Sequence, residues 1–180
     1  MHTLVLGGIR SGKSHWAEAA ITEAAPAGAP VRYLATATTD DDADTGWRQR
    51  ILSHRSRRPP AWDTVESADV AGQLRTGSHI ATLVDDIGGW LTAAMDRTGA
   101  WDSGSADSAA DDLIAAVKTF PAPLVLVSPE VGLTVVPATE AGRRFADALG
   151  TLNQRLAAAC DRVVLVVAGV AVPIKPQRGL

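Results

Sequence analysis

Eight residues near the start of the chain have the types and the spacing that a phosphate-binding loop requires. They match the pattern G-x-x-x-x-G-K-S and are Gly7, Gly8, Ile9, Arg10, Ser11, Gly12, Lys13 and Ser14. The glycines let backbone N–H groups turn toward phosphate oxygens, and a following helix points its positive end at the same anion. Lys13 would reach the β- and γ-phosphates, and the Ser14 hydroxyl would ligate Mg²⁺. Because an apolar run enters the loop and a helix-forming segment leaves it, the context favours a nucleotide site over a plain glycine turn.

Two adjacent carboxylates end the apolar run at residues 80–86, "IATLVDD". A phosphate loop usually works with a carboxylate at the end of a neighbouring strand, which helps to hold Mg²⁺. Adjacent residues of a strand point to opposite faces, so at most one of the two can face the loop. We expect Asp85 to hold Mg²⁺ with Ser14, and Asp86 to cap the helix that follows.

A histidine among arginines is the second unusual feature. His54 lies in the segment "WRQRILSHRSRRPPAWDTVE" (47–66), close to Arg48, Arg50, Arg55, Arg57 and Arg58. Surrounding positive charge disfavours the imidazolium form, so His54 should tend toward the neutral, nucleophilic form. A neutral imidazole beside a bound nucleotide could form a covalent phosphoramidate, with the arginines offsetting the phosphate charge. A solvated basic helix without chemistry is the alternative interpretation.

The composition limits the classes of protein to consider. The chain has 180 residues, 46% of them hydrophobic, which suits one domain (1–180) with a substantial core. The net charge of -3 argues against a general nucleic-acid binder. No apolar run is long enough to span a bilayer and no signal-peptide pattern is visible, so we expect a cytoplasmic protein. The single cysteine, Cys160, excludes an intrachain disulfide and is expected to be buried.

The elements that must position these residues alternate along the chain. Five continuous aliphatic runs predict buried strands, at residues 3–7, 31–36, 80–86, 123–128 and 162–169. Helices are predicted between them, at 14–25, 47–56, 68–75, 89–97, 109–119 and 140–159. This alternation indicates an α/β domain with a parallel sheet. Residues 98–108 are expected to form an exposed loop, and the tail at 173–180 to be frayed.

Taken in order, several segments resemble those of one enzyme family. They are "GGIRSGKS", "YLAT", the "RI…H…RRP…W.TVE" segment, "LVDD", "EVGLTVVP" and "LNQRLAAACDRVVLVVAGVAVPIK". The set resembles the bifunctional adenosylcobinamide kinase/adenosylcobinamide-phosphate guanylyltransferases of cobalamin biosynthesis, over nearly the whole chain. The resemblance implies a P-loop NTPase core of the RecA-like type, with a mostly parallel sheet and helices on both faces. It also implies a homotrimer with active sites near subunit interfaces.

The activity that this resemblance implies has two steps. ATP or GTP phosphorylates the hydroxyl of the aminopropanol arm of adenosylcobinamide, and GTP then guanylylates a histidine, which passes GMP to the new phosphate. His54 would be that histidine. Residues implied to contact nucleotide are the loop 7–14, Ala35, Thr36, Ala37, Arg55, Ser56, Arg57, Glu66 and Asp85. For Glu66, a solvated carboxylate at a strand end is an equally good interpretation.

Two positions depart from the family pattern. Some members carry adjacent histidines where this chain has Ser53-His54, and many carry Asn where this chain has Pro129. Glu130, which follows, either acts in the site or caps the loop.

Other functions remain open at this point. A P-loop kinase or ATPase without histidine chemistry is the first alternative. A regulatory GTP switch is the second, and the absence of an N-K-x-D motif counts against it. Large apolar residues in 89–119, namely Trp90, Leu91, Met95 and Trp101, offer some support for subunit assembly.

Overall fold

A computed structural model describes residues 1–36, 62–77 and 79–175. Its strands are β1 (His2–Gly7), β2 (Val31–Ala35), β3 (Trp62–Glu66), β4 (Ala81–Asp85), β5 (Leu124–Pro129), β6 (Arg162–Val167) and β7 (Val170–Lys175). Its helices are α1 (Lys13–Ala24), α3 (Val70–Thr76), α4 (Ile87–Thr98), α5 (Asp107–Thr119) and α6 (Glu140–Ala159). All five predicted strands are confirmed, and each predicted helix in these ranges lies within two residues of an observed one. The helix predicted at 47–56 falls outside the described residues.

The strands form one sheet in the order β3-β2-β4-β5-β1-β6-β7. Every neighbouring pair is parallel except β6 and β7, which form an antiparallel hairpin. β5 separates the strand that enters the phosphate loop, β1, from the strand that ends in Asp85, β4. The sequence had suggested that Asp85 ends the strand next to the one that enters the loop. In the structure its strand is instead two positions away, with β5 between them.

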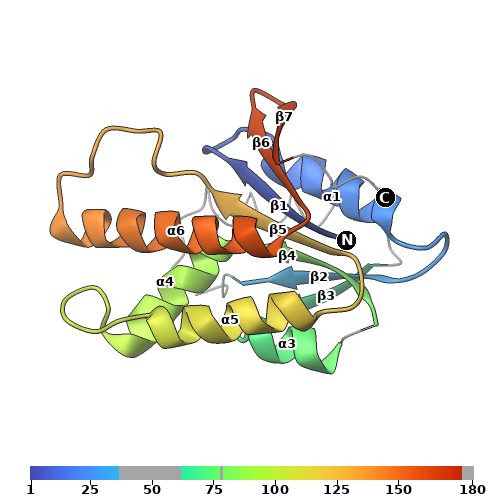
Figure 1. Cartoon of the computed structure of the whole chain (residues 1–180), viewed down its shortest axis with the longest axis horizontal. Helices are drawn as coiled ribbons and strands as arrows, with labels where there is room; N and C mark the ends of the chain where they lie inside the picture. The colour runs from blue at the N-terminus through green and yellow to red at the C-terminus, as the bar shows by residue number, and fades with distance from the viewer. Residues whose placement is uncertain (37–61, 78, 176–180) are drawn as a thin grey trace.

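Helices cover both faces of the sheet, as predicted. Helices α3, α4, α5 and α6 pack on one face, and α1 packs on the other (Figure 1). The period of two along each strand sends alternate side chains to these two layers. In β1, for example, Leu4 and Leu6 face the four-helix layer, whereas Val5 packs with Ala17 and Ile21 of α1. Because both faces are covered, the strands read as continuous aliphatic runs.

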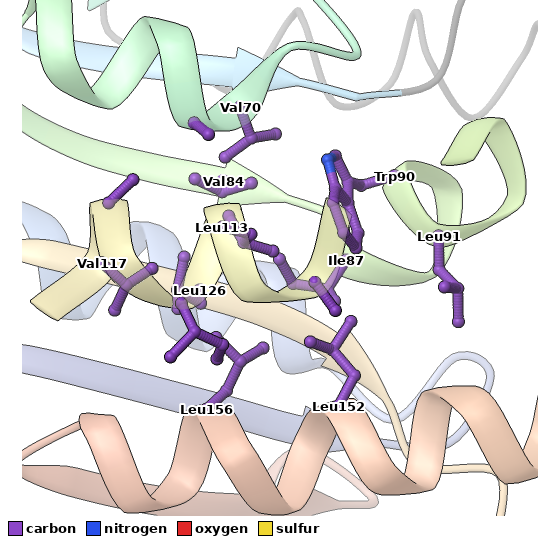
Figure 2. Close-up of a cluster of buried hydrophobic side chains, with 14 of the residues drawn as sticks. Val70, Val84, Ile87, Trp90, Leu91, Leu113, Val117, Leu126, Leu152 and Leu156 are labelled. Carbon is purple, nitrogen blue, oxygen red and sulfur yellow. The ribbon is translucent and has the colours of Figure 1, made fainter. Parts of the chain in front are cut away.

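The larger core cluster joins the four-helix layer to the sheet (Figure 2). Ile87, Trp90 and Leu91 of α4 point into it, and Met95 is 1% exposed. Trp101 stacks on Phe145 with ring centroids 6.0 Å apart. The expectation that these large residues support subunit assembly is therefore wrong, because their side chains pack against other residues of the same chain. Cys160 is buried as expected, and burial raises the pKa of its thiol to about 12.

Side chains of the expected types begin three of the helices. Asp69, Asp86 and Thr139 each accept a hydrogen bond from a backbone N–H in the first turn of α3, α4 and α6. Such caps satisfy N–H groups that have no partner within the helix. The predicted capping role of Asp86 is confirmed, with its Oδ1 2.7 Å from the nitrogen of Gly89.

The C-terminal part of the described chain is held more firmly than the sequence suggested. β7 continues to Lys175, whose ammonium donates to the carbonyls of Ala157 and Cys160 at 2.9 and 2.6 Å. The positive charge of Lys175 at that position also interacts favourably with the negative end of the α6 helix dipole. Fraying from residue 173 was therefore the wrong expectation for 173–175.

Candidate nucleotide site

The phosphate loop connects the carboxyl end of β1 to the amino end of α1. Lys13 is the first residue of α1, and its ammonium donates to the carbonyl oxygen of Gly8 at 3.3 Å, back across the loop. The N–H of Ser11 donates to the same carbonyl, also at 3.3 Å. Gly8, Ile9, Arg10 and Gly12 are exposed, so the outer surface of the loop is open to a ligand. The predicted strand–loop–helix context is thus present.

Two glycines of the loop are required by space and by backbone conformation. A Cβ atom on Gly7 would lie 2.8 Å from the carbonyl oxygen of Val166, closer than real Cβ contacts allow. Gly12 has φ +93°, a left-handed conformation that side chains rarely adopt, and the Cα atom of Gly169 lies 3.2 Å from where its Cβ would be. These contacts explain why the chain has glycine at both ends of the loop.

The loop is fixed by backbone hydrogen bonds to two neighbouring segments. The N–H of Glu130, just after β5, donates to the carbonyl of Gly7 at 3.1 Å. The N–H of Gly169, in the β6–β7 turn, donates to the carbonyl of Ser11 at 2.8 Å. The Glu130 side chain accepts from the N–H of Gly132 at 2.6 Å, so of the two roles left open for Glu130 the structure shows the loop cap.

Three further predicted residues lie in one row at the same edge of the sheet. Glu66, Ala35 and Asp85 are register partners at the carboxyl ends of β3, β2 and β4. Thr36 follows Ala35, is 2% exposed, and its hydroxyl donates to the carbonyl of Asp86 at 2.6 Å. Because parallel strands end at one edge, this row borders the edge from which the phosphate loop leaves β1.

The two adjacent aspartates differ in their partners. Asp85 accepts a hydrogen bond of 2.6 Å from the hydroxyl of Tyr33 on β2. Asp86 caps α4, and burial raises its carboxyl pKa, with the charge of Asp85 adding to the effect. The positive charge of Lys13 acts on the pKa of Asp86 in the opposite direction, so this carboxylate lies within electrostatic reach of the loop lysine.

The donor atoms at this edge suit Mg²⁺. Ser14, in the first turn of α1, and Asp85 both offer oxygen, which is the ligand type that Mg²⁺ prefers beside nucleotide phosphates. Within the described ranges, no three His, Cys, Asp or Glu side chains form a cluster that could hold a metal by themselves. An arrangement in which the nucleotide supplies the remaining ligands is typical of phosphate loops.

Five predicted site residues lie outside the described residues: Ala37, His54, Arg55, Ser56 and Arg57. Their predicted roles therefore stay predictions. Tyr33 is a contact of the site that the sequence interpretation did not include. Its position in "YLAT" just before Ala35 and Thr36 was the available signal.

The described part of the chain contains hollows away from this edge as well. One lies between α4, α5 and α6, where Arg144, Thr151 and Arg155 line it. Another lies near Pro26, His79 and Pro123. Neither includes a residue of the phosphate loop. No helix among the described residues combines the length and the apolar character needed to cross a bilayer.

Comparison with known proteins agrees with this architecture. The family model described as cobinamide kinase / cobinamide phosphate guanyltransferase matches residues 3–174. A Pseudomonas aeruginosa protein named bifunctional adenosylcobalamin biosynthesis protein CobP is 39% identical, over 98% of this chain and 99% of the relative. A Salmonella typhimurium protein, bifunctional adenosylcobalamin biosynthesis protein CobU, is 40% identical, over 97% of this chain and 100% of its own length.

Solved structures add a likeness in fold. A prototypical ATPase of the type III secretion system of pathogenic bacteria superposes with a TM-score of 0.55 and 10% identity. The match covers 91% of this chain and 51% of the ATPase. This supports the P-loop NTPase fold.

Proposed function

The chain belongs to the cobinamide kinase / cobinamide phosphate guanyltransferase family, and from this premise we propose how its residues divide the two reactions. It is a bifunctional kinase and guanylyltransferase of adenosylcobalamin biosynthesis. The observation that carries the assignment of residues is the phosphate loop at the same sheet edge as Glu66, Ala35 and Asp85. The substrates proposed are ATP or GTP, adenosylcobinamide and adenosylcobinamide phosphate.

In the kinase step, the substrate hydroxyl attacks the γ-phosphorus of the nucleotide, and the bond to the β-phosphate oxygen breaks. Backbone N–H groups of residues 7–14 and the Lys13 ammonium stabilise the charge on the phosphates. The hydroxyl proton leaves to solvent or to a nearby base, and no covalent bond to the protein forms. This role requires Lys13 to exchange its 3.3 Å bond with Gly8 for a phosphate oxygen.

Replacement of Lys13 tests the loop. Lys13→Ala should weaken the binding of nucleoside triphosphate and lower phosphoryl transfer by about a hundredfold or more, because it removes a charge aimed at the transferred group. Binding is measured by calorimetry and turnover by transfer of labelled γ-phosphate to cobinamide. A folded variant with wild-type rates would contradict the assignment.

In the guanylyl step, a ring nitrogen of His54 attacks the α-phosphorus of GTP. A P–N bond forms, the bond between the α-phosphorus and the β-phosphate oxygen breaks, and pyrophosphate leaves while the imidazole loses its ring proton. An oxygen of adenosylcobinamide phosphate then attacks the same phosphorus, which breaks the P–N bond and restores the histidine. Arg55 and Arg57 would offset the charge on the phosphates.

The two activities should therefore separate in one variant. His54→Ala should abolish transfer of label from α-labelled GTP to the protein while largely sparing phosphorylation of cobinamide, because the kinase step needs no protein nucleophile. The adduct should be labile to acid and stable to base, as a phosphoramidate is. Intact mass after incubation with GTP and Mg²⁺ measures it, and an acid-labile adduct on the variant would place the nucleophile elsewhere.

For the metal, we propose that Asp85 and Ser14 hold Mg²⁺, which neutralises phosphate charge when bound. Asp85→Asn should impair Mg²⁺-dependent turnover far more than Asp86→Asn, because the amide keeps the Asp86 cap on α4. Turnover is titrated against Mg²⁺ for both variants. The reverse order of effects would assign the metal to Asp86.

We further propose a cytoplasmic location and a homotrimer. Both rest on the family resemblance, and the exposed apolar side chains of the β6–β7 hairpin add physical support for assembly. Light scattering at micromolar concentration tests the trimer, and a monomer mass would contradict it.

A further inference from the structure

Asn153 is a buried amide with side-chain hydrogen bonds to the end of β5, and the proposed chemistry does not use it. It lies in α6 with 6% of its surface exposed. Its Oδ1 accepts from the hydroxyl of Ser128 at 2.6 Å, and its Nδ2 donates to the carbonyl oxygen of Pro129 at 3.1 Å. Leu152 and Leu156, before and after it in α6, pack into the core cluster (Figure 2) and so hold the helix against the sheet.

The amide acts on a single peptide group. The carbonyl of Pro129 accepts from Asn153, and the N–H on the other side of the same peptide, that of Glu130, donates to the carbonyl of Gly7 at 3.1 Å. A trans peptide is planar, with its C=O and N–H pointing in opposite directions. A hydrogen bond that fixes the direction of the Pro129 carbonyl therefore also fixes the direction in which the Glu130 N–H points.

Gly7 transmits this restraint to the phosphate loop. It is the last residue of β1 and the first of the loop, and its register partners are Pro129 on β5 and Val166 on β6, so its position is set from both sides. Ser128 completes the arrangement, since its hydroxyl donates to Oδ1 and so leaves the NH₂ end of the amide facing Pro129.

We propose that Asn153 is a positioning residue for the nucleotide, acting through the Pro129–Glu130 peptide on the start of the phosphate loop. The inference rests on the proposed function only in assigning the triphosphate to residues 7–14. Loop N–H groups bind phosphate well only when they are held in place before the ligand arrives, so a freer Gly7 should weaken nucleotide binding.

Two substitutions at position 153 distinguish the loss of the hydrogen bond to Pro129 from the effect of an added charge and from a loss of packing. Asn153→Asp keeps the acceptor for Ser128 and loses the donor to Pro129. Asn153→Leu keeps the branched shape, with methyl groups in place of the amide oxygen and nitrogen, and removes both hydrogen bonds without adding charge. Each should raise the Kd for GTP and the KM for GTP about tenfold, the loss expected for one hydrogen bond, with the KM for cobinamide unchanged.

Ser128→Ala keeps the donor to Pro129 but removes the bond that orients the amide, so it should raise the Kd for GTP by less than the Asn153 variants do. The matched control changes a buried hydroxyl that has no part in this arrangement. Thr82→Val, at the other end of the sheet, removes a buried hydroxyl that bonds only locally, to the carbonyl of Ile80 at 2.8 Å. It should lower the free energy of unfolding without changing the Kd for GTP.

The results distinguish a failure of the Asn153 role from a failure of the phosphate-loop assignment. If Lys13→Ala weakens GTP binding and both Asn153 variants bind GTP as Thr82→Val does, the positioning role is wrong and the loop assignment stands. If only Asn153→Asp weakens binding, the effect is charge repulsion and the inference fails. If Lys13→Ala leaves GTP binding unchanged, the loop assignment itself fails. Weaker GTP binding in both variants, at equal stability to Thr82→Val, supports the inference.

Discussion

At the scale of single residues, two adjacent carboxylates have separate roles because one ends a strand and the other begins a helix. Asp85 ends the strand beside Tyr33, whereas Asp86 turns to begin α4. The raised pKa of Asp86 means that the folded protein holds its proton to a higher pH than the unfolded chain does. The free energy of unfolding is therefore highest at low pH, where Asp86 is protonated in both states. It falls as the pH rises from the pKa of Asp86 in the unfolded chain to its pKa in the folded protein, and it stays lower above that value.

Removing the charge of Asp86 should consequently stabilise the fold at neutral pH. Asn is as good an N-cap as Asp, so Asp86→Asn keeps the bond to Gly89 and removes the cost of a buried charge. We expect a higher free energy of unfolding than wild type at pH 7, with the difference vanishing below about pH 4, where the unfolded chain is also protonated. Urea denaturation at several pH values measures this, and equal destabilisation at every pH would contradict it.

The hydroxyl of Tyr33 should matter for the metal more than for the fold. Tyr33→Phe keeps the buried ring and deletes the 2.6 Å bond that orients Asp85. We expect the Mg²⁺ concentration at half-maximal turnover to rise about tenfold or more, with a stability loss of about 1 kcal/mol. Titration of kinase activity with Mg²⁺ tests this. A loss of stability without a shift in the Mg²⁺ requirement would show that Tyr33 only packs.

What the sequence could predict at this scale depends on sequence distance. Residues 7–14 and the capping role of Asp86 were readable because motif and context are adjacent in the chain. The contacts Tyr33–Asp85 and Asn153–Pro129 join residues 52 and 24 positions apart. They depend on strand order and on the seating of α6 over β5, which no local pattern encodes.

At the scale of elements, the sheet interior was predictable and its edges were not. Interior strands carry continuous aliphatic runs because helices cover both faces. β3, at one edge, has only half-buried and exposed residues and ends in charged Glu66. β7, at the other edge, contains Pro173, which counts against a strand in sequence and is tolerated only where a strand has one partner.

The β6–β7 turn is under a local strain that one substitution should relieve. Ala168 has φ +50° and Gly169 has φ +80°, as a two-residue turn with both φ positive requires. Alanine is poorly suited to this conformation, whereas Asn adopts it readily. We expect Ala168→Asn to raise the free energy of unfolding by about 0.5–1 kcal/mol.

The measurement for this variant is thermal or urea unfolding, with GTP binding alongside. Because the N–H of Gly169 still donates to Ser11, the Kd for GTP should stay unchanged. Ala168→Val, which disfavours a positive φ further, serves as the opposing control and should lower stability. Equal stability of all three proteins would mean that the turn is not strained in solution.

At the scale of the whole molecule, most of the exposed large apolar side chains of the described residues lie in two segments, residues 133–136 and the β6–β7 hairpin. Val167, Val170, Val172 and Ile174 of the β6–β7 hairpin are between 49% and 64% exposed, and we call them the hairpin strip. Period-two spacing and the Val167–Val170 pairing place them on one face of the hairpin. β7 is also the edge strand, so its outer backbone groups are available for pairing. Soluble proteins seldom leave such an edge apolar and uncovered.

The hairpin strip gives the proposed homotrimer a specific test. If it forms the subunit interface, Val170→Thr with Val172→Thr should shift the mass in light scattering from three chains toward one at micromolar concentration. The threonines keep the strand propensity and remove the apolar contact, so the monomer should remain folded by circular dichroism. Leu133→Ser with Val136→Ser, in a segment outside the hairpin that is more exposed still, is the control pair and should leave the mass unchanged. Dissociation by the control pair and not by the hairpin pair would move the interface to residues 131–137, and an unchanged trimer in both would exclude the two surfaces. A wild-type monomer would contradict the assembly itself.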